Sequence, residues 1–222
     1  MSPSVRIAIQ GIICVYLLVM MGLSIYDTTK FNEPETWFTL VTSWNYILCV
    51  VYYLTIFALH LRHHMTSSLD ENESRIGWRE KFYWVLYTTS FIVCIAITVL
   101  FWALLFDEST SRGAFDLFLS IDRHGLNLVL LLFEFMVNKI PVRIYHYIHP
   151  FVFLILYVAF NGVYFEFTGL LVYDVLDWTN PTNASLLVIG VAVSGLFLQF
   201  IFYFIDYLKR RFIAKEEDDD IV

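Results

Sequence analysis

The stretch WFTLVTSWNYILCVVYYLTIFALH (37–60) combines the two features that decide the fold of this chain. It is long and apolar enough to cross a bilayer, whose hydrocarbon core of about 30 Å needs about 20 helical residues. Polar side chains nevertheless recur along it at the spacing of one helical face, at Thr42, Asn45, Cys49 and Tyr52. Because a polar face is costly to expose to lipid, we expect this face to point into a bundle of helices.

Five further segments of the chain have a similar length and apolar character. The chain is 59% apolar and only 16% charged, whereas about a quarter of the residues in soluble domains are charged. We therefore predict an all-α fold, a polytopic membrane bundle of six transmembrane helices that forms a single transmembrane domain over 1–208. The expected spans are 6–26, 37–60, 82–106, 116–137, 144–165 and 184–208. Pro150 marks either a kink in the fifth span or, if 142–149 lies flat at the interface, its first turn.

The Lys and Arg residues are distributed unequally between the loops of this arrangement. With the N-terminus in the cytoplasm, 11 of the 14 fall on the cytoplasmic side, and Lys30, Arg112 and Arg123 fall on the other side. Cytoplasmic loops are enriched in these residues, so the distribution predicts that both termini are cytoplasmic. A glycosylation sequon at Asn183 then lies on the outer side, beside the start of the sixth span, and a second at Asn72 lies in the cytoplasm.

The charge of the chain excludes some classes of partner. Much of the net charge of −7 comes from the five acidic residues 216–220, which follow four basic residues in the cytoplasmic tail, 209–222. Because no basic surface stands out, we expect membrane lipids as partners and no nucleic acid. The terminal Asp220-Ile221-Val222 is a candidate ligand for a PDZ-type groove, and a solvated acidic tail is the alternative. The three cysteines lie in apolar segments, which predicts close packing rather than a disulfide framework.

Two polar side chains inside the apolar segments, Thr42 and His124, are the candidate catalytic residues. His124 lies in FDLFLSIDRHGLNLVLLLFEFMV (115–137), and both side chains are expected at similar depth near the outer side. A threonine hydroxyl needs a base within hydrogen-bonding distance to become a nucleophile, and a neutral imidazole suits that task. Asn45 and Asn127 lie one helical turn away and are candidate substrate-binding residues, because amide N–H groups stabilise the oxyanion of an attacked ester.

Other interpretations of the polar residues remain open. Thr42 and His124 are also explained as side chains that hydrogen-bond between packed helices. Asp122 is expected to point away from His124, which leaves no acidic third partner. Glu134 and Asp206 would suit an ion path, although buried acids near helix ends more often satisfy local donors.

The remaining histidines are expected at the cytoplasmic side of the bundle. Their number falls short of what a histidine-rich di-iron site requires, so we predict no metal and no cofactor and favour contacts with phosphate headgroups. These histidines are His60, His63, His64, His146 and His149.

Most of the chain resembles the Rolling stone family of multi-pass membrane proteins. The order and spacing of several short motifs carry the resemblance, which implies a role in myoblast fusion. The motifs are Leu40-Val41-Thr42-Ser43-Trp44, His124-Gly125-Leu126-Asn127, Pro141-Val142-Arg143, His146, Pro150, Tyr157-Val158, Leu176-Asp177-Trp178 and Pro181.

Rolling stone proteins are distantly similar to the androgen-induced transmembrane threonine hydrolases, which cleave fatty acid esters of hydroxy fatty acids, and the matching positions in this chain are Thr42 and His124-Gly125. The similarity implies a threonine nucleophile at Thr42 and a histidine base at His124. The chain departs from the hydrolase pattern at Arg123 and Asn127, where the hydrolases carry asparagine and histidine. Two functions follow as hypotheses: an intramembrane lipid-ester hydrolase, or a non-catalytic protein that supports cell–cell fusion or adhesion. Either would reside in the plasma membrane or the endoplasmic reticulum.

Overall fold

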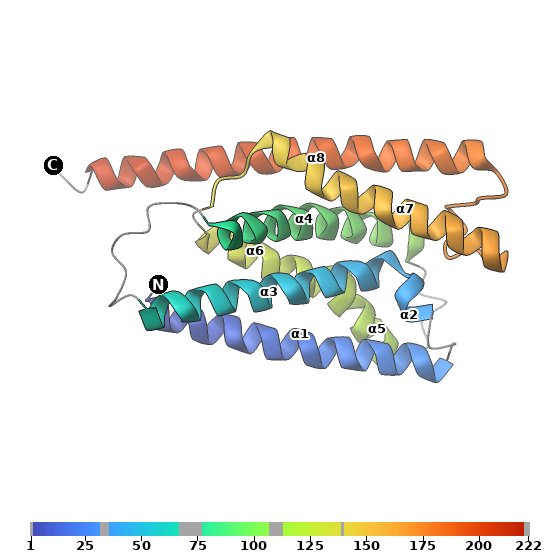
Figure 1. The fold of residues 1–222 in the computed structure, drawn as a ribbon, viewed down its shortest axis with the longest axis horizontal. Coiled ribbons are helices and arrows are strands. Elements are labelled where there is room, and N and C mark those ends of the chain that lie inside the picture. The colour runs from blue at the N-terminus through green and yellow to red at the C-terminus, as the bar shows by residue number, and fades with distance from the viewer. Residues whose placement is uncertain (1, 32–35, 67–76, 107–112, 139, 220–222) are drawn as a thin grey trace. The chain divides into compact units, whose positions relative to one another are not determined.

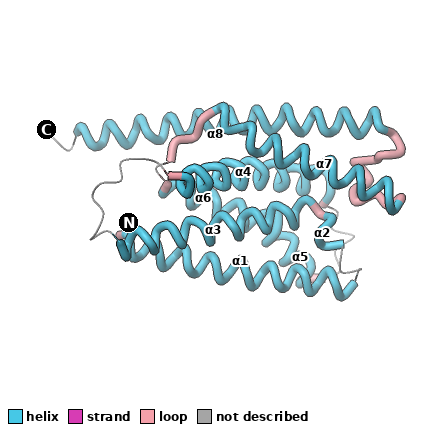
Figure 2. Tube along the Cα trace, viewed as in Figure 1, coloured by secondary structure: helices cyan, strands magenta, loops and turns pink. Residues whose placement is uncertain are grey.

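The computed structural model describes residues 2–31, 36–66, 77–106, 113–138 and 140–219 of the chain. Helices account for nearly all of these residues, joined by short loops, and the described part contains no strand (Figure 2). The predicted all-α fold is therefore confirmed. Within the described residues, five helices are long and apolar enough to cross a membrane. They cover Pro3–Lys30, Val41–Thr66, Trp78–Leu105, Ile144–Thr168 and Pro181–Phe212.

The chain divides into two compact units, Met1–Phe135 and Met136–Val222. Unit 1 contains both candidate catalytic residues, and unit 2 contains most of the C-terminal family motifs. The expectation of one transmembrane domain over 1–208 stays a prediction.

Unit 1 begins with an antiparallel pair, α1 (Pro3–Phe31) and α3 (Val41–Thr66), which lie side by side (Figure 1). The short helix α2 (Thr36–Thr39) connects the two. Near this turn, Trp37 donates its indole N–H to the Ser24 hydroxyl at 2.9 Å. At the far end, Nδ1 of His60 lies 2.8 Å from Oε1 of Gln10. Contacts at both ends therefore hold α3 antiparallel to α1.

Helix α4 (Trp78–Leu100) packs against α3 and continues into η1 (Phe101–Leu105), a π-helical turn. Tyrosine rings fill much of the α3–α4 interface, with Tyr52 stacked on Tyr83 at 5.6 Å between ring centroids. The two hydroxyls lie 3.3 Å apart, and both rings are buried. In a bilayer, this kind of close van der Waals and polar contact holds helices together, because lipid is as apolar as the side chains.

The fourth predicted span forms a continuous helical run composed of three elements. These are α5 (Ala114–Ile121), the π-helical turn η3 (Asp122–Leu126) and α6 (Asn127–Val137). Two carboxylates on this run are fully buried in unit 1. Glu134 forms an ion pair with Arg6 at 2.7 Å, and Asp122 accepts a hydrogen bond from Tyr16. Residue numbers rise along α1 as they fall along this run, so the run is antiparallel to α1 and parallel to α3.

Unit 2 is an antiparallel helical pair, α7 (Ile148–Thr168) and α8 (Pro181–Asp219), preceded by the 3₁₀ turn η4 (Ile144–Tyr147). Pro150 lies in the first turn of α7, directly after η4, and whether 142–149 lies flat at a membrane interface stays a prediction. Gly169 ends α7 in the left-handed conformation, φ +68°, and donates its N–H to the Phe165 carbonyl. Asn180 then caps α8, since the Asn183 N–H donates to its side-chain oxygen.

The expected second span, 37–60, is divided in the structure between α2 and α3. The chain breaks after α2, and the Leu40 carbonyl accepts hydrogen bonds from the backbone N–H groups of Ser43 and Trp44. Helix α3 therefore starts at Val41, and Thr42 lies in its first turn rather than well inside a longer helix.

Candidate functional site

The Asp122 carboxylate is the centre of a buried polar cluster in unit 1. The side chain is fully buried, and its two oxygens accept hydrogen bonds from different helices. Tyr16 of α1 donates to Oδ1, and Tyr46 of α3 donates to Oδ2 at 3.1 Å. A buried carboxylate is costly unless it is hydrogen-bonded, so these two phenols fix the position of η3 along the axes of α1 and α3.

His124 lies in the same π-helical turn and is 7% exposed. Its ring stacks face to face on Phe101 of η1, with centroids 3.5 Å apart and planes 3° apart. Trp102 of η1 also donates its indole N–H to the His124 backbone carbonyl at 3.1 Å. Two π-helical turns therefore hold the imidazole in one orientation, and such turns are frequent at functional sites. The Nδ1 atom of His124 is buried and has no hydrogen-bond partner among the described residues.

Thr42 is 7% exposed and lies in the first turn of α3. Tyr46, which binds Asp122, follows it by one helical turn on the same face, and α3 packs against η3. The bond of Tyr46 to Asp122 lies one turn after Thr42 on α3 and two residues before His124 on η3. The two side chains share no hydrogen bond within the described part of the chain, so their catalytic pairing stays a prediction.

Asn45 and Asn127 are both buried, at 1% and 2% exposure. The Asn127 amide donates an N–H to the Arg123 carbonyl at 3.4 Å, and Asn45 has a side-chain hydrogen bond to Cys94. The side-chain oxygens of both residues have no hydrogen-bond partner among the described residues. Each amide nitrogen carries two N–H donors, so the oxyanion-donor role predicted for these residues stays a prediction.

The inward-facing polar stripe predicted for residues 37–60 is confirmed. Its four members are all buried in unit 1. The corresponding prediction for the fourth segment is also confirmed, since His124, Asn127 and Glu134 are buried. Helical periodicity was sufficient to identify both faces, because side chains three, four and seven residues apart share one side of a helix.

The histidines predicted at the cytoplasmic side do not form one cluster. His60 bonds to Gln10 in unit 1, whereas His146 and His149 lie together in unit 2 with ring centroids 5.9 Å apart. Among the described residues, no group of three or more metal-ligating side chains is present.

Asp206 accepts hydrogen bonds from Arg210 and from the Val142 backbone N–H, as expected for a buried acid that satisfies local donors.

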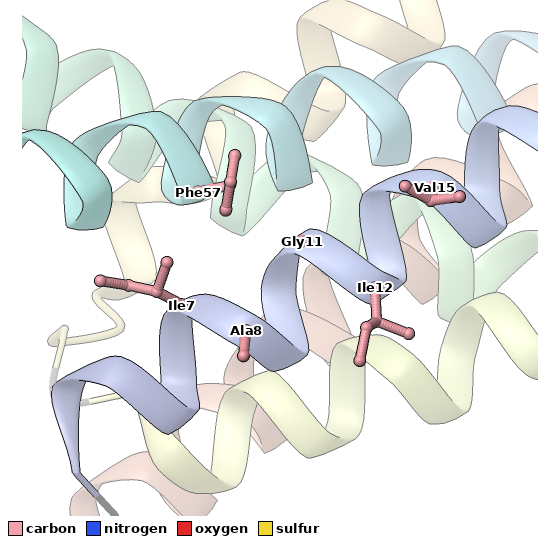
Figure 3. A pocket seen from close by; sticks show the side chains of 6 residues that line it. All are labelled: Ile7, Ala8, Gly11, Ile12, Val15 and Phe57. Atoms are coloured by element: carbon pink, nitrogen blue, oxygen red, sulfur yellow. The ribbon is translucent and has the colours of Figure 1, made fainter.

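An apolar groove of about 470 Å³ lies on the surface of unit 1 between α1 and α3 (Figure 3). It forms where Gly11 allows close approach of the Phe57 ring, whose nearest atom would lie 3.3 Å from an added Cβ. Phe57 is about 22 Å along α3 from Thr42, at 1.5 Å per residue. The groove is therefore separate from the candidate catalytic residues. Its lining residues are Ile7, Ala8, Gly11, Ile12, Val15 and Phe57.

Several C-terminal motif residues join α7 to the loop before α8 in unit 2. Trp178 donates its indole N–H to the side chain of Asn161 at 2.7 Å, and Asn161 donates to the Tyr157 hydroxyl at 3.3 Å. Gly162 leaves room for the Trp178 ring, which lies 3.5 Å from the position of an added Cβ. These motifs therefore have a structural role within unit 2.

Four residues around the candidate site were not predicted from the sequence. Tyr16, Tyr46, Phe101 and Trp102 surround the π-helical turn of Asp122 and His124. The chain contains 14 tyrosines and 21 phenylalanines, so residue type alone does not distinguish them. Tyr46 follows Thr42 by one helical turn, and this spacing was the available signal.

Comparison with known proteins supports the resemblance drawn from these motifs. The family model described as Protein rolling stone matches residues 7–216. The chain is 26% identical over 211 residues to Protein rolling stone of Drosophila melanogaster, which covers 89% of this chain and 76% of that protein. No solved structure matches the chain. The chain belongs to the Rolling stone family.

Proposed function

We propose that this membrane protein is an intramembrane lipid-ester hydrolase with Thr42 as nucleophile and His124 as general base. The observation that carries the proposal is the position of Thr42 in the first turn of α3, a helix packed against the π-helical turn of His124. The imidazole is held by stacking on Phe101 while its Nδ1 has no hydrogen-bond partner. A fixed ring nitrogen without a hydrogen-bond partner is available to accept a proton, as a general base must be.

In the proposed reaction, the Thr42 hydroxyl attacks the ester carbonyl and His124 takes the hydroxyl proton. The carbon–oxygen bond to the leaving alcohol then breaks, and His124 returns the proton to that alcohol. A water molecule next attacks the acyl-threonine ester, with His124 again accepting the proton and then returning it to the Thr42 oxygen. The products are the free fatty acid and the alcohol.

The start of α3 also offers a means of stabilising the oxyanion. The first backbone N–H groups of a helix have no partner within the helix, and the helix dipole places positive charge there. At the start of α3 the N–H groups of Ser43 and Trp44 donate to the Leu40 carbonyl, so the contribution proposed here is the positive end of the helix dipole near Thr42. It would add to the amide groups of Asn45 and Asn127.

Labelling with a fluorophosphonate probe tests the nucleophile. The purified wild-type protein should be labelled, and Thr42→Ala should lose the label because it lacks the attacking oxygen. Thr39→Ala is the matched control, since Thr39 is a buried threonine nearby whose hydroxyl donates to the Thr36 carbonyl. Labelling of Thr42→Ala at the wild-type level would remove Thr42 as the nucleophile.

The proposal includes six membrane crossings with both termini in the cytoplasm. The run Ala114–Val137 is the proposed additional crossing, and its carboxylates at positions 122 and 134 are buried against other helices of unit 1. Such burial removes the cost that these charges would have in lipid. The antiparallel contacts of this run with α1, at Arg6 and Tyr16, fit an outward first span and an inward fourth span.

The alternative is a non-catalytic protein that supports cell–cell fusion or adhesion. A specific observation in unit 2 favours it: large apolar side chains are exposed at the end of α7 and in the following loop, at Phe167, Leu170 and Val175. The loop is anchored by the bond of Trp178 to Asn161. In a cell-fusion assay, this alternative expects Thr42→Ala to retain activity and Phe167→Ser to lose it.

A further inference from the structure

The carboxamide oxygens of Asn45 and Asn127 remain unexplained by the proposed chemistry. Both side chains are at least 98% buried, and neither oxygen has a hydrogen-bond partner among the described residues. Exchanging oxygen and nitrogen does not help, because the exchange would turn the Asn127 oxygen toward the Arg123 carbonyl. In a membrane interior an unsatisfied polar group costs several kcal/mol.

These two acceptors are related to the candidate catalytic residues in the same way. Asn45 follows Thr42 by three residues on α3, and Asn127 follows His124 by three residues at the end of η3. The two helical runs are parallel and in contact, so each acceptor lies about 4.5 Å further along in the same direction. On each run, therefore, one acceptor lies one turn beyond a proposed catalytic residue.

Additional buried polar atoms without partners lie on the surrounding elements. They include Nδ1 of His124 and the Ser90 hydroxyl of α4. Acceptor oxygens require hydrogen-bond donors, and phosphate or carboxylate oxygens cannot supply them. A cationic headgroup would be repelled by the guanidinium of Arg123, which lies in the same turn as His124. The chemistry that remains is a neutral group with hydroxyl donors.

We infer that unit 1 binds a neutral lipid with free hydroxyl groups next to its acyl ester, a lipid of the monoacylglycerol class. Its hydroxyls donate to the side-chain oxygens of Asn45 and Asn127, and its ester carbonyl lies one turn back toward Thr42 and His124. The glycerol end occupies the polar interior of unit 1, and the acyl chain extends into the bilayer. This inference rests on the proposed function for its choice of an ester, and it names the substrate class of that site.

Direct binding of 1-oleoylglycerol to the full-length protein in nanodiscs tests the inference. The measurement uses the Thr42→Ala background, so that hydrolysis does not consume the ligand. Methyl oleate has the same ester without hydroxyls, and 1-oleoyl lysophosphatidic acid adds a phosphate. We expect saturable binding of 1-oleoylglycerol and at least tenfold weaker binding of the other two lipids.

The variants Asn45→Leu and Asn127→Leu remove the acceptors while keeping most of the side-chain volume. Each should weaken 1-oleoylglycerol binding about fivefold, as expected for one neutral hydrogen bond. Each variant also loses the hydrogen bond of its amide nitrogen, so the unfolding temperature is measured alongside binding and binding is compared at a temperature where parent and variant are both folded. A merely structural role of the two amides would leave the affinity for 1-oleoylglycerol unchanged in the folded variants.

Tyr53→Phe is the matched control, because it removes another buried, unpaired polar atom from α3 about two turns beyond Asn45. It should leave binding unchanged. Equal binding of methyl oleate and 1-oleoylglycerol, unchanged binding by both Leu variants, or no saturable binding would overturn the inference. The labelling of Thr42 by the fluorophosphonate probe is a separate measurement. Labelling without binding of 1-oleoylglycerol would therefore reject the substrate class alone, and loss of the labelling result would reject the nucleophile.

Discussion

The two phenols that hold Asp122 lead to a prediction at the scale of single residues. Tyr46→Phe removes one of the two donors to a fully buried carboxylate. It should lower the free energy of unfolding by about 1.5–3 kcal/mol, the range for hydrogen bonds to charged groups. Thermal unfolding of the detergent-solubilised protein measures the change.

Tyr26→Phe is the control for this prediction, because the Tyr26 side chain is 61% exposed. It should leave the unfolding temperature unchanged. If Tyr46→Phe also left the unfolding temperature unchanged while Asp122→Asn lowered it, the hydrogen bond from Tyr16 alone would be sufficient for the carboxylate.

Asp177, in the loop between α7 and α8, predicts a pH dependence of that loop. Its Oδ1 accepts hydrogen bonds from the Thr179 hydroxyl at 2.6 Å and from the Thr179 N–H at 2.8 Å. These bonds, the hydroxyl first, hold the pKa of Asp177 below its ordinary value. A lowered pKa stabilises the folded loop above the ordinary value near 3.9, and this stability is lost as the pH falls through the lowered pKa.

Hydrogen exchange of residues 173–180 measured from pH 6 to pH 2.5 checks this dependence, after correction for the intrinsic exchange rate. Protection should persist at pH 4.5 and fall below pH 4. In Thr179→Val the loss should begin at higher pH, because the main cause of the lowered pKa is absent. An identical profile in the variant and the wild type would contradict the role of the hydroxyl.

At the scale of elements, the α7–α8 pair of unit 2 depends on a single indole N–H at its loop end. Trp178→Phe leaves the buried side-chain oxygen of Asn161 without its donor. The cost should be about 1–3 kcal/mol of stability, the penalty for an unsatisfied buried acceptor. Proteolysis in the loop should accelerate accordingly, whereas Trp78→Phe, at a 72% exposed position, should change nothing.

The π-helical turns have an effect at the same scale. A π turn contains one more residue than an α turn, so it rotates the residues that follow relative to those before. In the run Ala114–Val137 the turn begins at Asp122, where the buried carboxylate bonds to α1 and α3. The direction in which His124 points is therefore set by this turn and not by the periodicity of a regular α-helix.

At the scale of the whole molecule, the proposed topology predicts a pattern of glycosylation. An acceptor sequon inserted near residue 172, in the loop between α7 and α8, should be glycosylated in a membrane-coupled translation assay. The native sequon at Asn72, which lies outside the described residues, should not be. Asn183 should also stay unmodified, because it is already in the first turn of α8. Glycosylation at Asn72 would show that the membrane orientation is opposite to the proposed one.

The C-terminal PDZ-type ligand stays a prediction, since residues 220–222 lie outside the described residues. The side chains of the preceding acidic tail are likewise not described. A pull-down with a peptide of the last ten residues, compared with the same peptide carrying an amidated C-terminus, would test it, because strand-addition grooves bind the free carboxylate.

The sequence by itself determined which segments are helical and which faces of them point inward. Apolar length is a local property, and so is the three-to-four-residue spacing that gathers Thr42, Asn45 and Cys49 on one side. The family was also readable from short motifs whose order is preserved along the chain.

Only the tertiary structure decided the surroundings of the candidate site. Asp122 meets Tyr16 and Tyr46 across 106 and 76 residues of sequence, and His124 meets Phe101 across a π-helical turn. The break at Leu40, which sets Thr42 at a helix start, also depends on contacts such as that of Trp37 with Ser24 of another helix. Such features follow from which distant side chains satisfy one another once the helices pack, and no local pattern encodes that choice.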